Sequence, residues 1–190
     1  MLGLIYDTET TGKWNFTAPS DDPSQPHLVQ LCAILEDVEA NEIVSELNVI
    51  IRPDGIVIPL EATKVHRITQ ERAESAGVRL SNACHIFRDM VERASFLVAH
   101  NMDFDIRIIQ KAFLDSDTPP PPWSTIPLRC TMKTATPITR IPGTRGFKWP
   151  TLTECMQHFY GTGVEGAHNA KTDTMACRDI HRALMNMGAF

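Results

Sequence analysis

Residues 2–12 read LGLIYDTETTG, and this stretch decides how the rest of the chain is interpreted. The apolar run Leu2–Tyr6 predicts a short buried strand, and two carboxylates, Asp7 and Glu9, follow it directly. Because side chains alternate along a strand, this spacing places both carboxylates on one face at the strand's end. Ligands of open α/β sheets commonly lie beyond strand ends. An isolated Asp-x-Glu pair is most often a polar turn, so this pair needs partners elsewhere.

A second acidic segment, His100–Asp105, follows another short apolar run, Phe96–Ala99, which also predicts a strand. Asn101 fits the N-cap of a helix, which would place Asp103 in the first turn, where an acid only complements the helix dipole. We therefore expect Asp105, about half a turn further on, to face the site.

A third segment, His168–Asp173, leads into the last predicted helix, at about residues 170–187. The two end residues converge most easily if His168 stays on the preceding glycine-containing loop and Asp173 lies on the helix. A histidine on a loop beside an acid suits a general base. Taken alone, His168 would most often be an ordinary surface histidine.

The remaining pattern predicts an α/β fold in which helices flank a mixed five-stranded sheet. The strand-like runs 29–38 and 43–51 are joined by a polar turn and predict a hairpin, so the first three strands are sequential and antiparallel. The other expected elements are strands at 96–99 and 128–131, a short helix after Pro59, and helices near 80–93, 104–113 and 151–160. Pro119–Pro122 cannot be helical.

Composition narrows the class of protein. The 18 Lys and Arg against 23 Asp and Glu give a formal net charge of -5, and 43% of the residues are hydrophobic. We expect a single domain over residues 1–190, with an irregular insertion at about 13–27 and a basic, proline-containing segment at about 118–150. No apolar stretch approaches the roughly 18 residues of a membrane helix, so no membrane association is expected. Five scattered cysteines without a C-x-x-C pair, and no secretory signal, favour a cytoplasmic location.

Charge is distributed unevenly. No acid lies between Asp117 and Glu154, whereas five basic residues do: Arg129, Lys133, Arg140, Arg145 and Lys148. The segment therefore carries +5 and the rest of the chain -10, from 13 basic and 23 acidic residues. It is either a solvated basic loop or a strip that follows a polyanion, with Phe147 and Trp149 available for base stacking.

Taken together, the acidic segments resemble the three exonuclease motifs of the DEDDh family. The matching residues are Asp7-Thr8-Glu9-Thr10-Thr11-Gly12, His100-Asn101-x-x-Phe104-Asp105 and His168-x-Ala170-x-x-Asp173-x-x-Ala176. Val65–Thr69 resembles a weaker fourth segment, with Arg67 where the family usually has Gly, and Trp149-x-x-Leu152 matches the usual approach to the penultimate helix. The family includes the proofreading subunit of bacterial replicative polymerases, ribonuclease T and oligoribonuclease, and it has a ribonuclease H-like fold.

The resemblance implies a 3′–5′ exonuclease that releases nucleoside 5′-monophosphates from single-stranded nucleic acid. It implies four metal-binding and catalytic acids, Asp7, Glu9, Asp105 and Asp173, and a general base, His168, that takes the proton of the attacking water. It also implies substrate contacts from Thr8, Thr10, His66 and Asn101.

Elementary electrostatics explains why such a site needs metal ions. Two carboxylates about 4 Å apart repel by on the order of 4 kcal/mol at an effective dielectric of 20, so a cluster must be protonated or bind cations. Oxygen-only ligands favour two Mg²⁺ or Mn²⁺ ions, which would clamp the scissile phosphate.

The first motif departs from the family at Lys13, where an apolar residue usually wedges between the last bases. Either Trp14 or Phe16 takes over that role, or the terminal bases stack elsewhere. Single-stranded DNA is slightly preferred over RNA as substrate, because the aromatic insertion and the basic segment suit a long strand. Two alternatives stay open: an RNA-trimming enzyme of the ribonuclease T or oligoribonuclease kind, and a proofreading subunit with a polymerase partner. The last predicted helix ends close to Phe190, which favours the free-standing enzyme.

Overall fold

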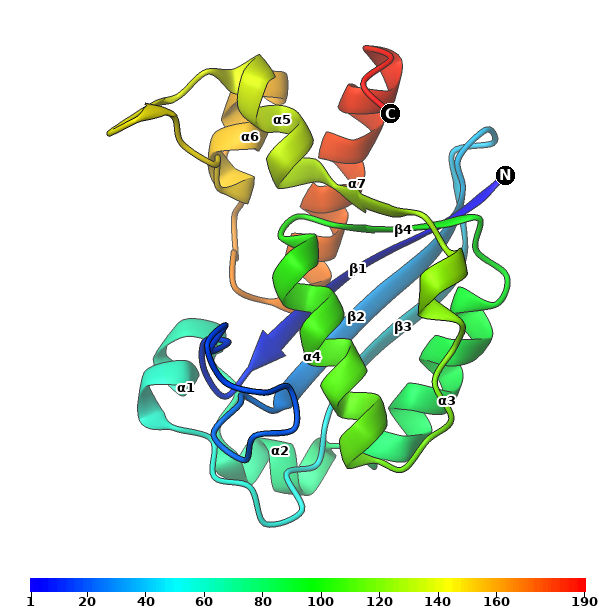
Figure 1. Ribbon diagram of the computed structural model, residues 1–190, viewed down its shortest axis with the longest axis vertical. Helices are drawn as coiled ribbons and strands as arrows, with labels where there is room; N and C mark the ends of the chain where they lie inside the picture. The colour runs from blue at the N-terminus through cyan, green and yellow to red at the C-terminus, as the bar shows by residue number, and fades with distance from the viewer.

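The computed structural model describes residues 1–190 and contains one five-stranded sheet flanked by helices (Figure 1). The strands are β1 (Leu2–Thr10), β2 (Leu28–Asp37), β3 (Glu42–Ile50), β4 (Phe96–Ala99) and β5 (Leu128–Cys130). They lie in the order β3-β2-β1-β4-β5, in which β1, β2 and β3 pair antiparallel and β1, β4 and β5 pair parallel. The predicted mixed sheet and its antiparallel hairpin are confirmed.

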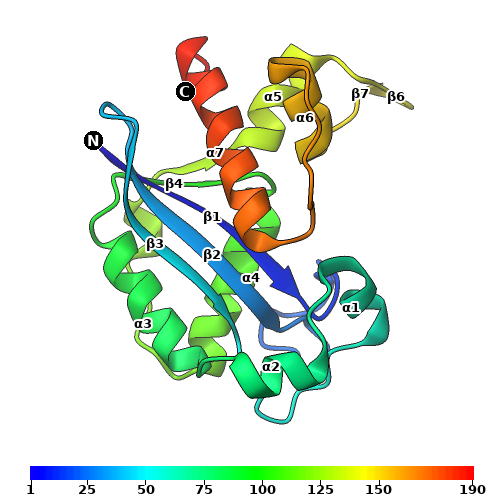
Figure 2. The ribbon, with the colours of Figure 1, turned by 180° about the vertical axis from the view of Figure 1, so that it is seen from behind.

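Seven helices pack around this sheet: α1 (Leu60–His66), α2 (Gln70–Ala76), α3 (Leu80–Val91), α4 (Met102–Asp115), α5 (Thr131–Thr139), α6 (Leu152–Tyr160) and α7 (Ala170–Asn186). Helices α3 and α4 cover one face, and α7 crosses the other with α5 and α6 beside it (Figures 1 and 2). The largest core cluster lies under α3 and α4, and a smaller one lies between the sheet and α7. None of the helices combines the length and the apolar character needed to cross a bilayer.

Local chemistry explains most helix boundaries. Thr151, the expected N-cap of α6, accepts a hydrogen bond from the backbone of Glu154, whose side chain in turn accepts one from the Thr151 backbone. Two helices and the small β6–β7 hairpin (Pro142–Gly143 and Gly146–Phe147) are not predicted by the sequence pattern. One is α2, which is short and almost entirely polar; the other is α5, which contains Pro137, a residue that argues against a helix.

The insertion at 13–27 forms no helix or strand, as predicted, yet it is closely held. At its neck, the Thr11 N–H donates to the His27 carbonyl at 3.0 Å, and the His27 N–H donates to the Thr11 hydroxyl at 2.9 Å. Inside the loop the buried Gln25 amide donates to the carbonyls of Asn15 at 2.8 Å and Pro19 at 3.1 Å. These bonds fix the loop beside the end of β1 and along α4, whose Arg107 and Asp115 it contacts (Figure 1).

Candidate active site

Two carboxylates stand on one face at the end of β1, the central strand of the sheet. Asp7 lies opposite Cys32 of β2, and Glu9 lies opposite Gln30, so the two acids share a face as strand alternation requires. Thr8, between them, points to the other face and donates its hydroxyl to Asp105 Oδ1 of α4 at 2.7 Å. The end of β1 therefore reaches acids on both sides of the sheet.

Helix α7 brings the third carboxylate to the same place. Asn169 caps this helix through its side chain, and the Asp173 N–H donates to the Asn169 carbonyl at 3.0 Å. One ligand oxygen each from Asp7, Glu9 and Asp173 lies within 4.8 Å of the others. The structure thus brings together acids from segments more than 160 residues apart in the chain.

Asp105 and Asp103 have separate environments on α4. The Asp105 side chain is buried, receives the Thr8 hydroxyl and lines the same cleft as the three clustered acids, although it stands outside their tight group. Asp103 is exposed and forms an ion pair with Lys133 at 2.5 Å. The choice of Asp105 over Asp103 as the acid that faces the site therefore agrees with the geometry.

The electrostatics of these acids are unfavourable for the ionised state. Burial, followed by repulsion from Asp105, Asp173 and Glu9, raises the pKa of Asp7 well above its ordinary value. Burial and the neighbouring acids likewise raise the pKa of Glu9 to about 8, and burial raises the pKa of Asp105 to about 7. Asp173 shows the same upward direction, with burial as the main cause.

The donor set fits a hard divalent cation. None of the four acids is ion-paired with a lysine or arginine, and the buried Oδ1 of Asp173 has no hydrogen-bond partner. Unpaired carboxylate oxygens are the ligands that Mg²⁺ and Mn²⁺ prefer. A cation bound among Asp7, Glu9 and Asp173 would offset the cost of keeping these partly buried carboxylates ionised side by side.

His168 lies on the loop that precedes α7, with its side chain exposed and its backbone in the left-handed region at φ 66°. Its N–H donates to Asp173 Oδ2 at 3.0 Å, which ties the loop to the acid cluster. Both residues line the cleft. This placement, on the loop rather than on the helix, is the arrangement that the sequence favoured.

The four predicted substrate contacts divide into two pairs. Thr8 and Asn101 line the cleft. Thr10 and His66 do not: the Thr10 hydroxyl donates to the Gly12 carbonyl at 2.6 Å and closes the turn, while His66 Nδ1 accepts the Ile68 N–H at 3.1 Å. His66 is buried near the Thr10 backbone, with its pKa lowered mainly by burial, so it lies behind the end of β1, and its contact with a substrate stays a prediction.

Aromatic side chains line the mouth of this cleft, which has a volume of about 780 Å³. Trp14 is buried in the core, whereas Phe16 is 64% exposed, so Phe16 is the residue of the insertion that is available to a base. Trp149 is 63% exposed on the segment before α6, and Phe104 of α4 adds a half-buried ring. Arg107 lies 5.4 Å from the Phe16 ring centroid, a contact that the sequence pattern does not predict because it joins the insertion to α4.

The basic segment at 118–150 is a less continuous strip than its sequence indicates. Arg129 is half-buried with its guanidinium 3.6 Å from the Phe96 ring centroid, so the structure rules it out as part of an open cationic surface. Lys133 and Lys148 are ion-paired with Asp103 and Glu154. The interpretation as a polyanion-binding strip is thus weakened, because Arg129 packs against the core and the two lysines are already neutralised by ion pairs at the surface.

His100, the first residue of the second motif, has a structural role in the site that the sequence does not indicate. It is buried, and its Nδ1 and Nε2 lie 3.0 Å from the Thr131 hydroxyl and 2.9 Å from the Pro150 carbonyl. Burial lowers its pKa to about 4, so the ring is neutral at pH 7, and its Nε2–H donates a hydrogen bond to the Pro150 carbonyl. This link holds the wall of the cleft that carries Trp149.

Comparison with known protein families identifies the family of this chain. Residues 4–180 match the exonuclease family of the RNase T type, which is most of the chain. The chain belongs to this DEDDh exonuclease family. Membership agrees with the motifs quoted above and makes this protein a hydrolytic nuclease of a kind that typically uses divalent metals.

Solved structures of Escherichia coli Exonuclease I share the fold. The complex with a dT13 oligonucleotide has a TM-score of 0.75 at 18% identity and covers 96% of this chain and 40% of that one. The complex with dA16 has a TM-score of 0.76 at 17% identity, and the match covers 97% of this chain and 41% of that one. A zinc-bound complex with single-stranded DNA has a TM-score of 0.71 at 20% identity, and the match covers 98% of this chain and 40% of that one. The chain therefore spans about two fifths of the length of Exonuclease I. No curated protein matches its sequence.

Proposed function

We propose that residues 1–190 form a single 3′–5′ exonuclease domain that removes nucleoside 5′-monophosphates from single-stranded ends. The observation that carries the proposal is the group of three uncompensated carboxylates, Asp7, Glu9 and Asp173, inside an aromatic-lined cleft. Exonuclease I, which shares the fold, has been solved with single-stranded oligonucleotides bound. Acids that bind metal and rings that stack on bases are the two requirements of this reaction.

Two divalent cations, Mg²⁺ or Mn²⁺, complete the proposed site. Asp7, Glu9 and Asp173 would hold one, and Asp105, on the other side of Asp7, would support the second. When bound, such ions supply positive charge that stabilises the attacking and leaving oxygens of phosphodiester hydrolysis. Lys13 also lines the cleft but is ion-paired with none of these acids, so the carboxylate cluster itself has no positive partner from the chain.

His168 is the proposed general base. Its imidazole accepts a proton from the attacking water, whose oxygen forms the new bond to phosphorus while the bond from phosphorus to the 3′ oxygen breaks. The 3′ oxygen of the shortened strand takes a proton from solvent and becomes a hydroxyl, and the released nucleotide keeps the phosphate. The hydrogen bond from the His168 N–H to Asp173 positions the loop for this role.

Phe16 and Trp149 are the proposed platforms for the last bases of the strand. Both are largely exposed and both line the cleft, Phe16 from the insertion and Trp149 from the segment before α6. Glu9 and the backbone at Thr8 would recognise the terminal 3′-hydroxyl, with Asn101 beside them. DNA is the slightly preferred substrate, now on the strength of the aromatic insertion rather than the basic segment.

A gel time course tests this function. Single-stranded DNA and RNA of one sequence, each labelled at the 5′ end, are incubated with Mg²⁺, Mn²⁺ or EDTA. We expect a ladder that shortens from the 3′ end with either ion and no cleavage in EDTA. The matched control is Asp103→Asn, which changes an acid of α4 outside the cleft and should leave the ladder unchanged. Cleavage that persists in EDTA, or products that retain an intact 3′ end, would refute the proposal.

A further inference from the structure

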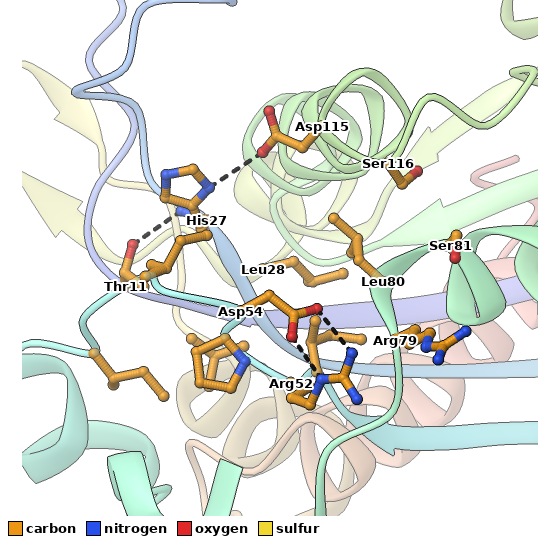
Figure 3. A pocket seen from close by; sticks show the side chains of 15 residues that line it. Thr11, His27, Leu28, Arg52, Asp54, Arg79, Leu80, Ser81, Asp115 and Ser116 are labelled. Atoms are coloured by element: carbon orange, nitrogen blue, oxygen red, sulfur yellow. Dashed lines mark hydrogen bonds and ion pairs between the residues drawn. The ribbon is translucent and has the colours of Figure 1, made fainter. Parts of the chain in front are cut away.

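A second cavity, of about 430 Å³, lies between the neck of the insertion and the ends of α3 and α4 (Figure 3). It shares no lining residue with the acid cleft, and the proposed reaction makes no use of it. Its volume falls within the range of small-molecule pockets, about 300–1,000 Å³. The cavity is therefore large enough for one nucleotide-sized group.

The floor of this cavity is aliphatic. Leu28 and Val29 of β2, Ile51 after β3, and Ile58 before α1 line it, and all four are at least nine-tenths buried. Such a floor removes the apolar face of a ligand from water, which favours binding by roughly 25 cal/mol per Å² covered. A nucleobase has an apolar face of this kind on an otherwise polar molecule.

The rim carries charge, most of which is already neutralised. Arg52 bonds to Asp54 at 2.6 Å on one side, and His27 bonds to Asp115 at 3.1 Å on the other (Figure 3). Arg79 is exposed beside the Arg52–Asp54 pair and has no ion-pair partner of its own. The rim therefore offers one unpaired guanidinium, which suits a phosphate.

The cavity and the cleft come close to each other along the chain at the neck of the insertion. Thr11 lines the cavity and Lys13 lines the cleft, so only Gly12 lies between the two lining residues. A strand whose 3′ end lies among the acids can reach the cavity by passing over this neck.

We propose that the cavity binds one upstream nucleotide of the substrate strand, with its base on the aliphatic floor and its phosphate at Arg79. The proposal rests on the exonuclease function proposed above and adds a second grip, which makes long strands better substrates than short ones. A free nucleoside 5′-monophosphate has the same chemistry, so the experiment must separate the two sources.

Binding without catalysis provides the first arm of the experiment. A fluorescent single-stranded decanucleotide is titrated in EDTA with wild type, Arg79→Ala, Arg79→Lys and the control Arg93→Ala, which removes an exposed arginine at the far end of α3. We expect Arg79→Ala to weaken binding about 10-fold, Arg79→Lys to restore part of it, and Arg93→Ala to have no effect. The slope of log K against log salt should also become shallower by about 0.7 in Arg79→Ala, the value for one lost phosphate contact on a single strand.

Activity on two lengths of substrate provides the second arm. Arg79→Ala should raise KM for the decanucleotide about 10-fold and leave kcat, and both constants for a dinucleotide, unchanged. Equal binding and equal KM in Arg79→Ala and wild type would overturn the proposal. If Arg79→Ala weakened the binding of adenosine 5′-monophosphate but left decanucleotide binding unchanged, the cavity would bind a free nucleotide and the proposal that the substrate strand occupies it would be wrong. If no enzyme cleaves any strand, the proposed function fails, whereas the EDTA arm still decides the cavity.

Discussion

Helix α7 packs against two groups of buried carboxylates that the protein treats in opposite ways. Glu36 of β2 is fully buried, and two arginines of α7 neutralise it, Arg178 at 2.6 Å and Arg182 at 3.1 Å. One and a half turns before Arg178, Asp173 lies among Asp7 and Glu9 with no basic side chain paired to any of them. A buried charge is costly unless it is paired. At Glu36 the chain supplies the neutralising cations as two arginines. At the cleft it supplies no paired cation, so the neutralising charge has to come from solution.

The first prediction removes one acid of the unpaired group. Asp7→Asn should lower exonuclease activity to less than about one part in 10⁴, because the cation proposed to stabilise the reacting phosphate would lose one of its three carboxylate ligands. In EDTA the same variant should melt at a higher temperature than wild type, since one source of repulsion is gone, and added Mg²⁺ should stabilise it less. Activity that simple Mg²⁺ titration restores would contradict the role of Asp7.

The second prediction separates binding from proton transfer in the cleft. His168→Ala should lower kcat by about 10²–10⁴-fold while the affinity for single-stranded oligonucleotide in EDTA stays the same. The matched control is His158→Ala, which removes an exposed histidine of α6 outside the cleft. Unchanged turnover in the His168 variant would remove this residue from the mechanism.

The third prediction breaks the paired group. Glu36→Gln should lower the free energy of unfolding by about 3–5 kcal/mol, because it leaves Arg178 and Arg182 without their buried counter-charge. Urea unfolding in EDTA measures the loss, and Glu39→Gln, which changes a largely exposed acid near the N-terminus, is the control. The activity of the folded fraction should remain. A variant as stable as wild type would mean that Glu36 is no better neutralised than the cleft.

The fourth prediction uses pH to expose the same contrast. In the metal-free protein Glu9 has a pKa raised from 4.5 to about 8 and Asp105 one raised from 3.8 to about 7, both mainly by burial. Between the ordinary and the raised pKa of each group, the native state holds a proton that the unfolded chain has lost. The free energy of unfolding must therefore fall as the pH rises from about 4 to 8. Melting temperatures in EDTA across that range should decline, and Mg²⁺ should reverse most of the decline at pH 8. A flat profile in EDTA would show that the acids are compensated after all.

Most of the cleft could be predicted from the sequence, because it is built from local signals. Asp7 and Glu9 come directly after an apolar strand, Asp105 follows another, and Asp173 lies in the first turn of the helix predicted at about residues 170–187. Strand alternation and helix caps act over a few residues, so the pattern carries them. The mixed sheet follows from the same local signals together with the family resemblance.

The remaining features depend on contacts between distant segments. The pairing of Glu36 with α7 joins positions 142 and 146 residues apart, and no local pattern indicates it. The same is true of Arg129, which counts as a surface cation in the sequence and stacks on Phe96 in the fold. Thr10 and His66 match family motifs but do not line the cleft, because motif identity does not specify the direction of a side chain. Helix α5 was unexpected because Pro137 lies inside it, near its end.

The smallest expected effect concerns aromatic rings, which the two regions also use differently. Near α7, the Arg129 guanidinium lies against the Phe96 and Phe190 rings, which are therefore occupied by a contact within the fold. At the cleft, Arg107 lies 5.4 Å from the Phe16 centroid while 64% of Phe16 stays exposed, which leaves a ring surface for a base. Stacking on an aromatic is worth about 1–3 kcal/mol per base, so Phe16→Ala should raise KM for single-stranded DNA about 10-fold or more and change kcat little. Phe147→Ala is the matched control, since this ring is 52% exposed on the β6–β7 hairpin and does not line the cleft. An equal rise in KM for both variants would mean that the substrate strand also contacts the basic segment, because Phe147 belongs to that segment and Phe16 belongs to the insertion.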